Sequence, residues 1–172
     1  MAALVVALIL RRPIRDALKD RAIGEFSFGA QGFKVVTIER SLQDATKAIA
    51  PATASLDDRR PDVVADDRAS LLALAEVAPN AAVMEAFRLV EIELRNVVDP
   101  ERSLRISVQR LARQAVAERW ISVAVSEGVD DLARIRNGVS HGDESVTVDQ
   151  AVRFVDLAIG ILIILRSEPP RR

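Results

Sequence analysis

From Arg68 onward, apolar residues recur at spacings of three and four, and this periodicity restricts the fold more than any other feature of the chain. Residues at these spacings share one face of an α-helix, so each such segment predicts a helix with one side in a core. The clearest set is Ala81, Met84, Phe87, Val90 or Glu91, and Leu94. Aromatic residues make up only 3% of the chain, so aliphatic side chains must fill the core, which favours packed helices over a β-sandwich. We therefore predict a mostly α protein.

Prolines and capping residues divide this region into helices. Pro79 ends a helix over 70–77 and suits the first turn of a second helix that runs to Val98. Further helices are expected over 103–120, 122–140 and 148–166, the last preceded by a capping box of Thr147 and Gln150. The last helix is strongly apolar, but its charged residues favour a buried core helix over a membrane span. Together these segments predict a helical bundle of four to five helices.

The N-terminal segment, residues 1–22, joins an apolar run to a basic one. Residues 1–10 are apolar, and Arg11 and Arg12 follow at once. A membrane-spanning helix needs about 20 apolar residues, and a signal peptide carries its positive charges before the apolar run. The pattern is typical of the cytoplasmic end of a membrane helix. Two interpretations stay open. In the first, residues 1–21 are a membrane-anchor remnant through which a cytoplasmic protein contacts the inner face of the membrane. In the second, they form an amphipathic helix that docks on a core or a partner.

Residues 23–67 are expected to form an appendage and a linker. Phe26 and Phe28 alternate with polar residues, glycines follow, and residues 33–38 are rich in β-branched side chains, which predicts a small β-hairpin. A short helix over 41–50 should end at Pro51, completing a unit over 23–50. Residues 51–67 hold two prolines and five aspartates without periodicity and are read as a linker. The main domain then covers 68–166, and residues 167–172 form a tail.

Composition excludes several kinds of chemistry. The chain has no cysteine and one histidine, so disulfides, zinc–thiolate sites, cysteine nucleophiles and a multi-histidine metal site within one chain are excluded. We expect no metal and no cofactor. The net charge is −1, so no global basic field exists to hold nucleic acid, and any RNA contact must come from a local patch.

The candidate site is the segment from Arg136 through Asn137 and Gly138 to His141. Val129, Leu132, Arg136 and Val139 follow one another at steps of three, four and three, which puts Arg136 on the apolar face of its helix. A guanidinium there needs partners or a cavity. His141, about one turn further on, can act as a general acid or base, and an arginine can stabilise charge on a phosphorane. Because the 2′-hydroxyl of RNA is an internal nucleophile, this set suits metal-free RNA cleavage, with Asn137 in support.

Two other interpretations of the same residues stay open. In the first, Arg136 is a salt-bridge hub and His141 only caps the helix, in a non-catalytic, membrane-tethered interaction or regulatory module. Glu76, Glu85, Glu91 and Glu93 are the available partners of Arg136. In the second, the same cavity binds a nucleotide or another small ligand.

Arg136, the polar Asn137, and His141 after four intervening residues resemble the signature of the HEPN superfamily, at the end of the penultimate helix. The run over 86–95 and the final helix after a short polar turn fit this context, and the resemblance covers about residues 70–166. It implies a homodimer with two Arg–His sets facing each other across the interface, acting on RNA as a metal-independent endoribonuclease with Arg136, His141 and Asn137 catalytic. It also implies a place in toxin–antitoxin or anti-phage defence systems, with an antitoxin or regulatory protein as partner.

Overall fold

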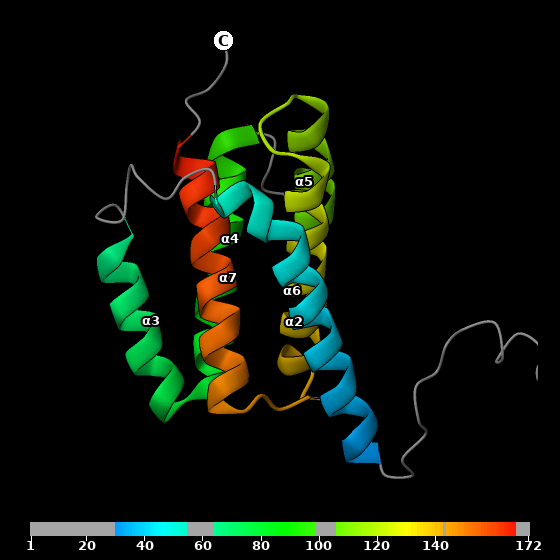
Figure 1. Cartoon of the computed structure of the whole chain (residues 1–172), viewed down its shortest axis with the longest axis vertical. Coiled ribbons are helices and arrows are strands. Elements are labelled where there is room, and N and C mark those ends of the chain that lie inside the picture. Colours follow the sequence, from blue (N-terminus) through cyan, green and yellow to red (C-terminus); the bar gives the residue numbers. More distant parts are fainter. Residues whose placement is uncertain (1–29, 55–63, 99–105, 143, 168–172) are drawn as a thin grey trace, which may run out of the picture. The chain divides into compact units, whose positions relative to one another are not determined.

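The computed structural model of the chain describes residues 30–54, 64–98, 106–142 and 144–167, with side chains from Thr37 onward. The chain divides after Phe33 into two units, and the description below concerns the second, residues 34–172. The described residues fold into α-helices and contain no strand (Figure 1). The prediction of a mostly α protein is thus confirmed.

The described part of the chain contains six helices, compared with the four or five expected. They are α2 (Ala30–Ala54), α3 (Ala65–Val77), α4 (Pro79–Val98), α5 (Val108–Ala117), α6 (Val123–Ser140) and α7 (Val148–Ser167). Helices α4 and α7 pack along each other, and α3 packs against both (Figure 1). Helices α5 and α6 pack against each other and against α4. Helix α4 therefore lies at the centre of the bundle.

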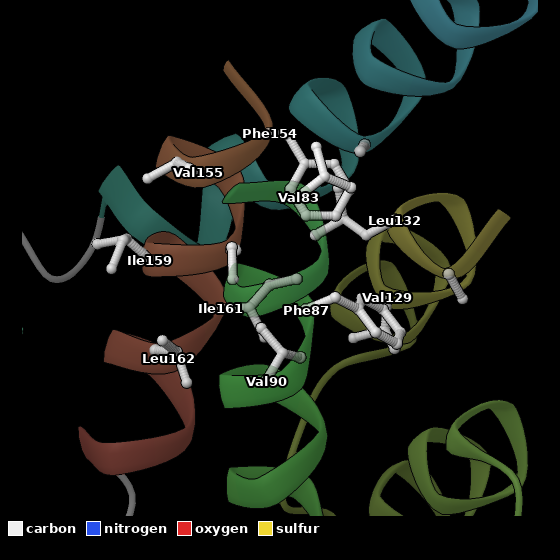
Figure 2. Close-up of a cluster of buried hydrophobic side chains, with 14 of the residues drawn as sticks. Val83, Phe87, Val90, Val129, Leu132, Phe154, Val155, Ile159, Ile161 and Leu162 are labelled. Carbon is white, nitrogen blue, oxygen red and sulfur yellow. The ribbon is translucent and has the colours of Figure 1, made fainter. Parts of the chain in front are cut away.

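Aliphatic side chains and two phenylalanines form the core, as the composition indicated. Phe87 of α4 and Phe154 of α7 are among the largest fully buried side chains. Figure 2 shows Val83, Phe87 and Val90 of α4 beside residues of α6 and α7. Burying a side chain of this size stabilises the fold by about 1.5–3 kcal/mol, so this shared core fixes α6 against α4.

Local capping sets several helix boundaries where they were expected. The Thr147 N–H donates to Oε1 of Gln150 at 3.0 Å, and the Gln150 N–H donates to Oγ1 of Thr147 at 3.2 Å. This reciprocal pair is the predicted capping box, and α7 begins at Val148 directly after it. At α6, the Val125 N–H donates to Oγ of Ser122 at 3.3 Å. The expected bounds of α4 match the structure.

The predicted second strand of the hairpin, over residues 33–38, is wrong because these residues belong to α2. The first strand, over 26–28, lies outside the described residues. The preference of β-branched residues for strands is weak, and burial against the bundle overrides it. Ile38, Leu42, Ala45 and Ile49 recur at helical spacing and are all buried in the common core. The part of that segment from Ile38 to Ile49 therefore packs into the bundle core.

The expected helix end at Pro51 is also wrong, because α2 continues to Ala54 with Pro51 inside it. Only one further turn follows the proline, and Oγ1 of Thr53 in that turn donates to the carbonyl of Ile49 at 3.3 Å. The predicted linker over 51–67 is likewise helical at both ends, over 51–54 and 65–67, and residues 55–63 lie outside the described residues. Two of its aspartates, Asp66 and Asp67, stand in the first turn of α3, where the helix dipole favours negative charge.

None of the helices in the described ranges combines the length and the apolar character that crossing a bilayer requires. The apolar and basic segment over 1–22 lies outside those ranges.

Candidate functional site

Helix α6 carries the candidate site and is fixed by its apolar face. Val129, Leu132 and Val139 are buried, and Arg136 lies on the same side of the helix, as their spacing predicted. The Arg136 side chain is 31% exposed, so its guanidinium reaches the surface while its stem packs on the core.

Three groups contact the guanidinium of Arg136. Its Cζ lies 5.2 Å from the centre of the Phe87 ring on α4, within the range of a cation–π contact. Its Nη1 donates to Oδ1 of Asn137 at 3.0 Å. Its Nη2 lies 3.6 Å from Oε2 of Glu91, an ion pair too long for a hydrogen bond. A guanidinium has five N–H donors, and in the described part of the chain only Asn137 takes a hydrogen bond from this one. Arg136 therefore has donors left for a further acceptor.

Glu91 is shared between two arginines. Nη2 of Arg95, one turn further along α4, lies 2.5 Å from Oε1 of Glu91, much closer than Arg136 is to Oε2. Nη2 of Arg95 also donates to the carbonyl of Ile106 at 3.3 Å, just before α5. All three charged side chains are half-buried, and together they carry a charge of +1. We name Arg95, Glu91 and Arg136 the three-charge cluster.

These contacts show that Glu91 is the glutamate that pairs with Arg136. Glu91 was one of four candidates, whereas Glu85 pairs with Arg88 and Glu93 pairs with Arg166. Sequence reasoning missed Arg95. Its signal is the four-residue spacing from Glu91, which places both side chains on one face of α4.

His141 ends α6 as its C-cap residue. Its backbone N–H donates to the carbonyl of Asn137 at 3.0 Å, and its side chain is exposed. Within the described ranges, the imidazole has no hydrogen bond or ion pair. A spacing of five residues turns the direction of the side chain by about 140° around a helix axis. One chain therefore places Arg136 and His141 at the same end of α6 without bringing them into contact.

Gly138 lets another group come close to the backbone of α6, as the sequence suggested, and that group is Glu144. The Glu144 N–H donates to the carbonyl of Gly138 at 3.1 Å, and a Cβ at Gly138 would collide with the Glu144 carboxylate. Gly142 has a φ of +70° and lets the chain turn back over the helix end. The site thus includes a carboxylate that sequence reasoning did not name.

No group of three or more histidine, cysteine, aspartate or glutamate side chains in the described ranges could hold a metal ion. Comparison of the chain with models of known protein families, with curated proteins and with solved structures gives no match. The resemblance to the HEPN superfamily therefore stays a prediction based on the motif and its position at the end of α6.

Proposed function

We propose that the chain is a HEPN-like, metal-independent endoribonuclease that acts as a homodimer, with Arg136 and His141 as its catalytic residues. The observation that carries the proposal is the state of Arg136. The side chain is held against Phe87 at the surface of the bundle, and it has N–H donors to spare for a phosphate. A guanidinium held in this way can contact two phosphate oxygens at once.

The chemistry needs no nucleophile from the protein. The 2′-oxygen of a ribose attacks the adjacent phosphorus, the bond to the 5′-oxygen breaks, and a 2′,3′-cyclic phosphate forms. His141 moves the proton, either from the 2′-hydroxyl or to the leaving 5′-oxygen. Arg136 stabilises the charge on the phosphorane, and Asn137 orients the guanidinium through its 3.0 Å hydrogen bond. Since the two side chains do not meet within one chain, a second copy facing the first would complete each set.

A second candidate function is favoured by the pairing of Arg136. Its contacts with Glu91 and Phe87, and the capping position of His141, also fit a non-catalytic interaction or regulatory module, tethered to a membrane through its N-terminal segment. In this case the cluster serves the packing of α6 on α4.

RNA cleavage in the presence of a metal chelator separates the two candidates. For the nuclease, we expect His141→Ala to lower the cleavage rate about 10²- to 10⁴-fold and Arg136→Ala about 10²- to 10³-fold. Arg134→Ala is the matched control, because Arg134 is an exposed arginine on the same helix that pairs with Asp131. It should cleave like the unaltered chain, and a 2′-O-methyl strand should not be cut at all.

Arg136→Ala should still fold. Its half-exposed ion pair contributes about 0–1 kcal/mol and its cation–π contact about 0.5–1 kcal/mol, so the loss of stability stays below about 2 kcal/mol. Full cleavage activity in both Arg136→Ala and His141→Ala would disprove the catalytic roles. The absence of cleavage by the unaltered dimer, with a lower melting temperature of Arg136→Ala, would favour the regulatory module.

A further inference from the structure

Three arginines on and just after α5 are exposed and have no ion pair in the described part of the chain: Arg110, Arg113 and Arg119. Every other arginine whose side chain is described takes part in one. These paired residues are Arg40, Arg68, Arg88, Arg95, Arg134, Arg136, Arg153 and Arg166. The described arginines without an ion pair are thus confined to α5 and the turn that follows it.

Helix α5 separates its charges from its apolar side. Val108, Leu111, Ala112 and Ala115 are buried, where α5 packs against α4 and α6, and the opposite side presents Arg110 and Arg113, while Arg119 follows just after the C-cap of the helix. Between Val108 and Trp120 the chain carries three arginines and one glutamate, a local charge of +2 in a protein of net charge −1. We name Arg110, Arg113 and Arg119 the basic face of α5. It is the local patch that RNA binding requires in a chain without a global basic field.

A pocket of about 440 Å³ lies where this basic face ends. Arg119 and Trp120 line it, together with Val123 and Ile164. The indole Nε1 of Trp120 donates to Oε2 of Glu118 at 3.1 Å, which fixes the edge of the ring. Trp120 is half-buried, and Val123 beside it is 61% exposed. Exposed cations close to an aromatic ring that lines an open, mostly apolar pocket are the combination that binds single-stranded nucleic acid.

We propose that the basic face of α5 binds the phosphates of single-stranded RNA and that Trp120 stacks on one of its bases. The choice of RNA rests on the proposed nuclease function, and the surface would hold the strand that Arg136 and His141 cut. Charge complementarity supports a polyanion, and the pocket beside Trp120 supports one with flat, apolar groups along it. The other end of α5 adjoins the three-charge cluster, because Arg95 donates to the carbonyl of Ile106.

The test measures binding without cleavage. The probe is a fluorescein-labelled 2′-O-methyl oligouridine of about 12 nucleotides, within the usual range of single-strand site sizes. It lacks the nucleophile, so binding is read whether or not the protein is a nuclease. Each phosphate contact adds about 0.7 to the slope of log affinity against log salt for a single strand. The triple variant R110Q/R113Q/R119Q should lose about 2 from that slope and bind about 100-fold more weakly at ~0.1 M salt.

A matched control removes three exposed arginines that are paired: R40Q/R88Q/R134Q. It changes the net charge equally and should keep a slope close to that of the unaltered chain. Trp120 is the only tryptophan, so its fluorescence reports the pocket directly and should fall when the strand binds. Trp120→Leu keeps an apolar side chain and should weaken binding about 5- to 150-fold, the effect of losing one stacked base.

Each result decides the proposal. Equal loss of binding in the two triple variants would show an effect of bulk charge and overturn it, as would no binding by the unaltered chain. Binding of vesicles rich in anionic lipid, but not of the oligonucleotide, through the same three arginines would overturn the assignment to RNA. Binding through the basic face without cleavage of ordinary RNA would uphold this inference while the nuclease proposal fails. Unchanged binding together with unchanged cleavage in R110Q/R113Q/R119Q would overturn this inference while the nuclease proposal stands.

Discussion

Arg119 has a backbone conformation that glycine normally adopts. Replacing an arginine by glycine should therefore stabilise the protein at this position but destabilise it inside α5. The φ of Arg119 is 63°, in the left-handed region, directly after the C-cap of α5. The Trp120 N–H donates to the carbonyl of Ala115 at 2.8 Å, and the Arg119 N–H donates to that of Val116 at 3.0 Å. These two bonds define a Schellman motif, whose left-handed residue is most often glycine.

The change is Arg119→Gly, and its size follows from this conformation. The left-handed conformation costs a residue with a Cβ about 1–2 kcal/mol, and glycine gives back about 0.4–1 kcal/mol through the greater freedom of the unfolded chain. We expect a net gain of about 0.5–1 kcal/mol in the free energy of unfolding. Arg113→Gly is the control, because Arg113 lies inside α5, where glycine costs about 1 kcal/mol.

Urea unfolding of both variants measures the two free energies, provided that the slope of the unfolding free energy against urea stays constant. Both variants lose one unpaired arginine, so each should lower the salt slope of RNA binding by about 0.7. We therefore expect Arg119→Gly to be more stable and Arg113→Gly to be less stable than the unaltered chain, while RNA binding is weakened equally in both. A less stable Arg119→Gly would refute the reasoning on the backbone, and unchanged binding in both would refute the role of the arginines.

Three further predictions concern the contact between α2 and α6 and the carboxylates Asp131 and Glu39. A Cβ at Gly128 would lie 2.8 Å from Cδ1 of the buried Ile49, so Gly128→Ala should destabilise the unaltered chain by about 0–2 kcal/mol yet stabilise Ile49→Ala by about 1 kcal/mol. Additive effects in this double-mutant cycle would mean that α2 does not pack on α6 as described. Burial raises the pKa of Asp131, so Asp131→Asn should raise the melting temperature at neutral pH, and the gain should vanish as acid protonates the native carboxyl. A hydrogen bond from Arg153 lowers the pKa of Glu39, so Glu39→Gln should lose stability at neutral pH. This loss should fade as the pH falls through the native pKa of Glu39. Melting curves of the Asp131 and Glu39 variants from about pH 3 to pH 7 test both pH dependences.

The helix boundaries that could be predicted are those set by interactions between residues close together in the sequence. Pro79 at the start of α4 and the Thr147–Gln150 box before α7 act within one turn, so sequence alone locates them. The part of α2 before Ser41 could not be predicted in this way, because its β-branched residues favour a strand locally. The helix depends on the burial of Ile38 and Ile49 by segments far along the chain.

The candidate site divides in the same way. The spacing of apolar residues on α6 was enough to single out Arg136, because helical geometry fixes which side of the helix it occupies. The choice of Glu91 over the other glutamates depends on how α4 packs against α6, and sequence does not contain that arrangement. The basic face of α5 was hidden for a related reason. The sequence lists every arginine, but only the fold shows which of them have carboxylate partners.

Pairing also changes what the near-zero net charge means for nucleic acid. An arginine beside a carboxylate contributes little field at a distance, since the two charges cancel, whereas an unpaired arginine attracts a phosphate over a distance of about one Debye length, ~10 Å. The field close to α5 is therefore set by its unpaired arginines more than by the total of −1. Arg110 and Arg113 lie one turn apart on α5 and Arg119 follows just after the helix, so the basic face can contact more than one phosphate. Because Arg95 joins the segment before α5 to Glu91 and Arg136, a strand held on α5 would lie near the cation that the proposed nuclease mechanism requires.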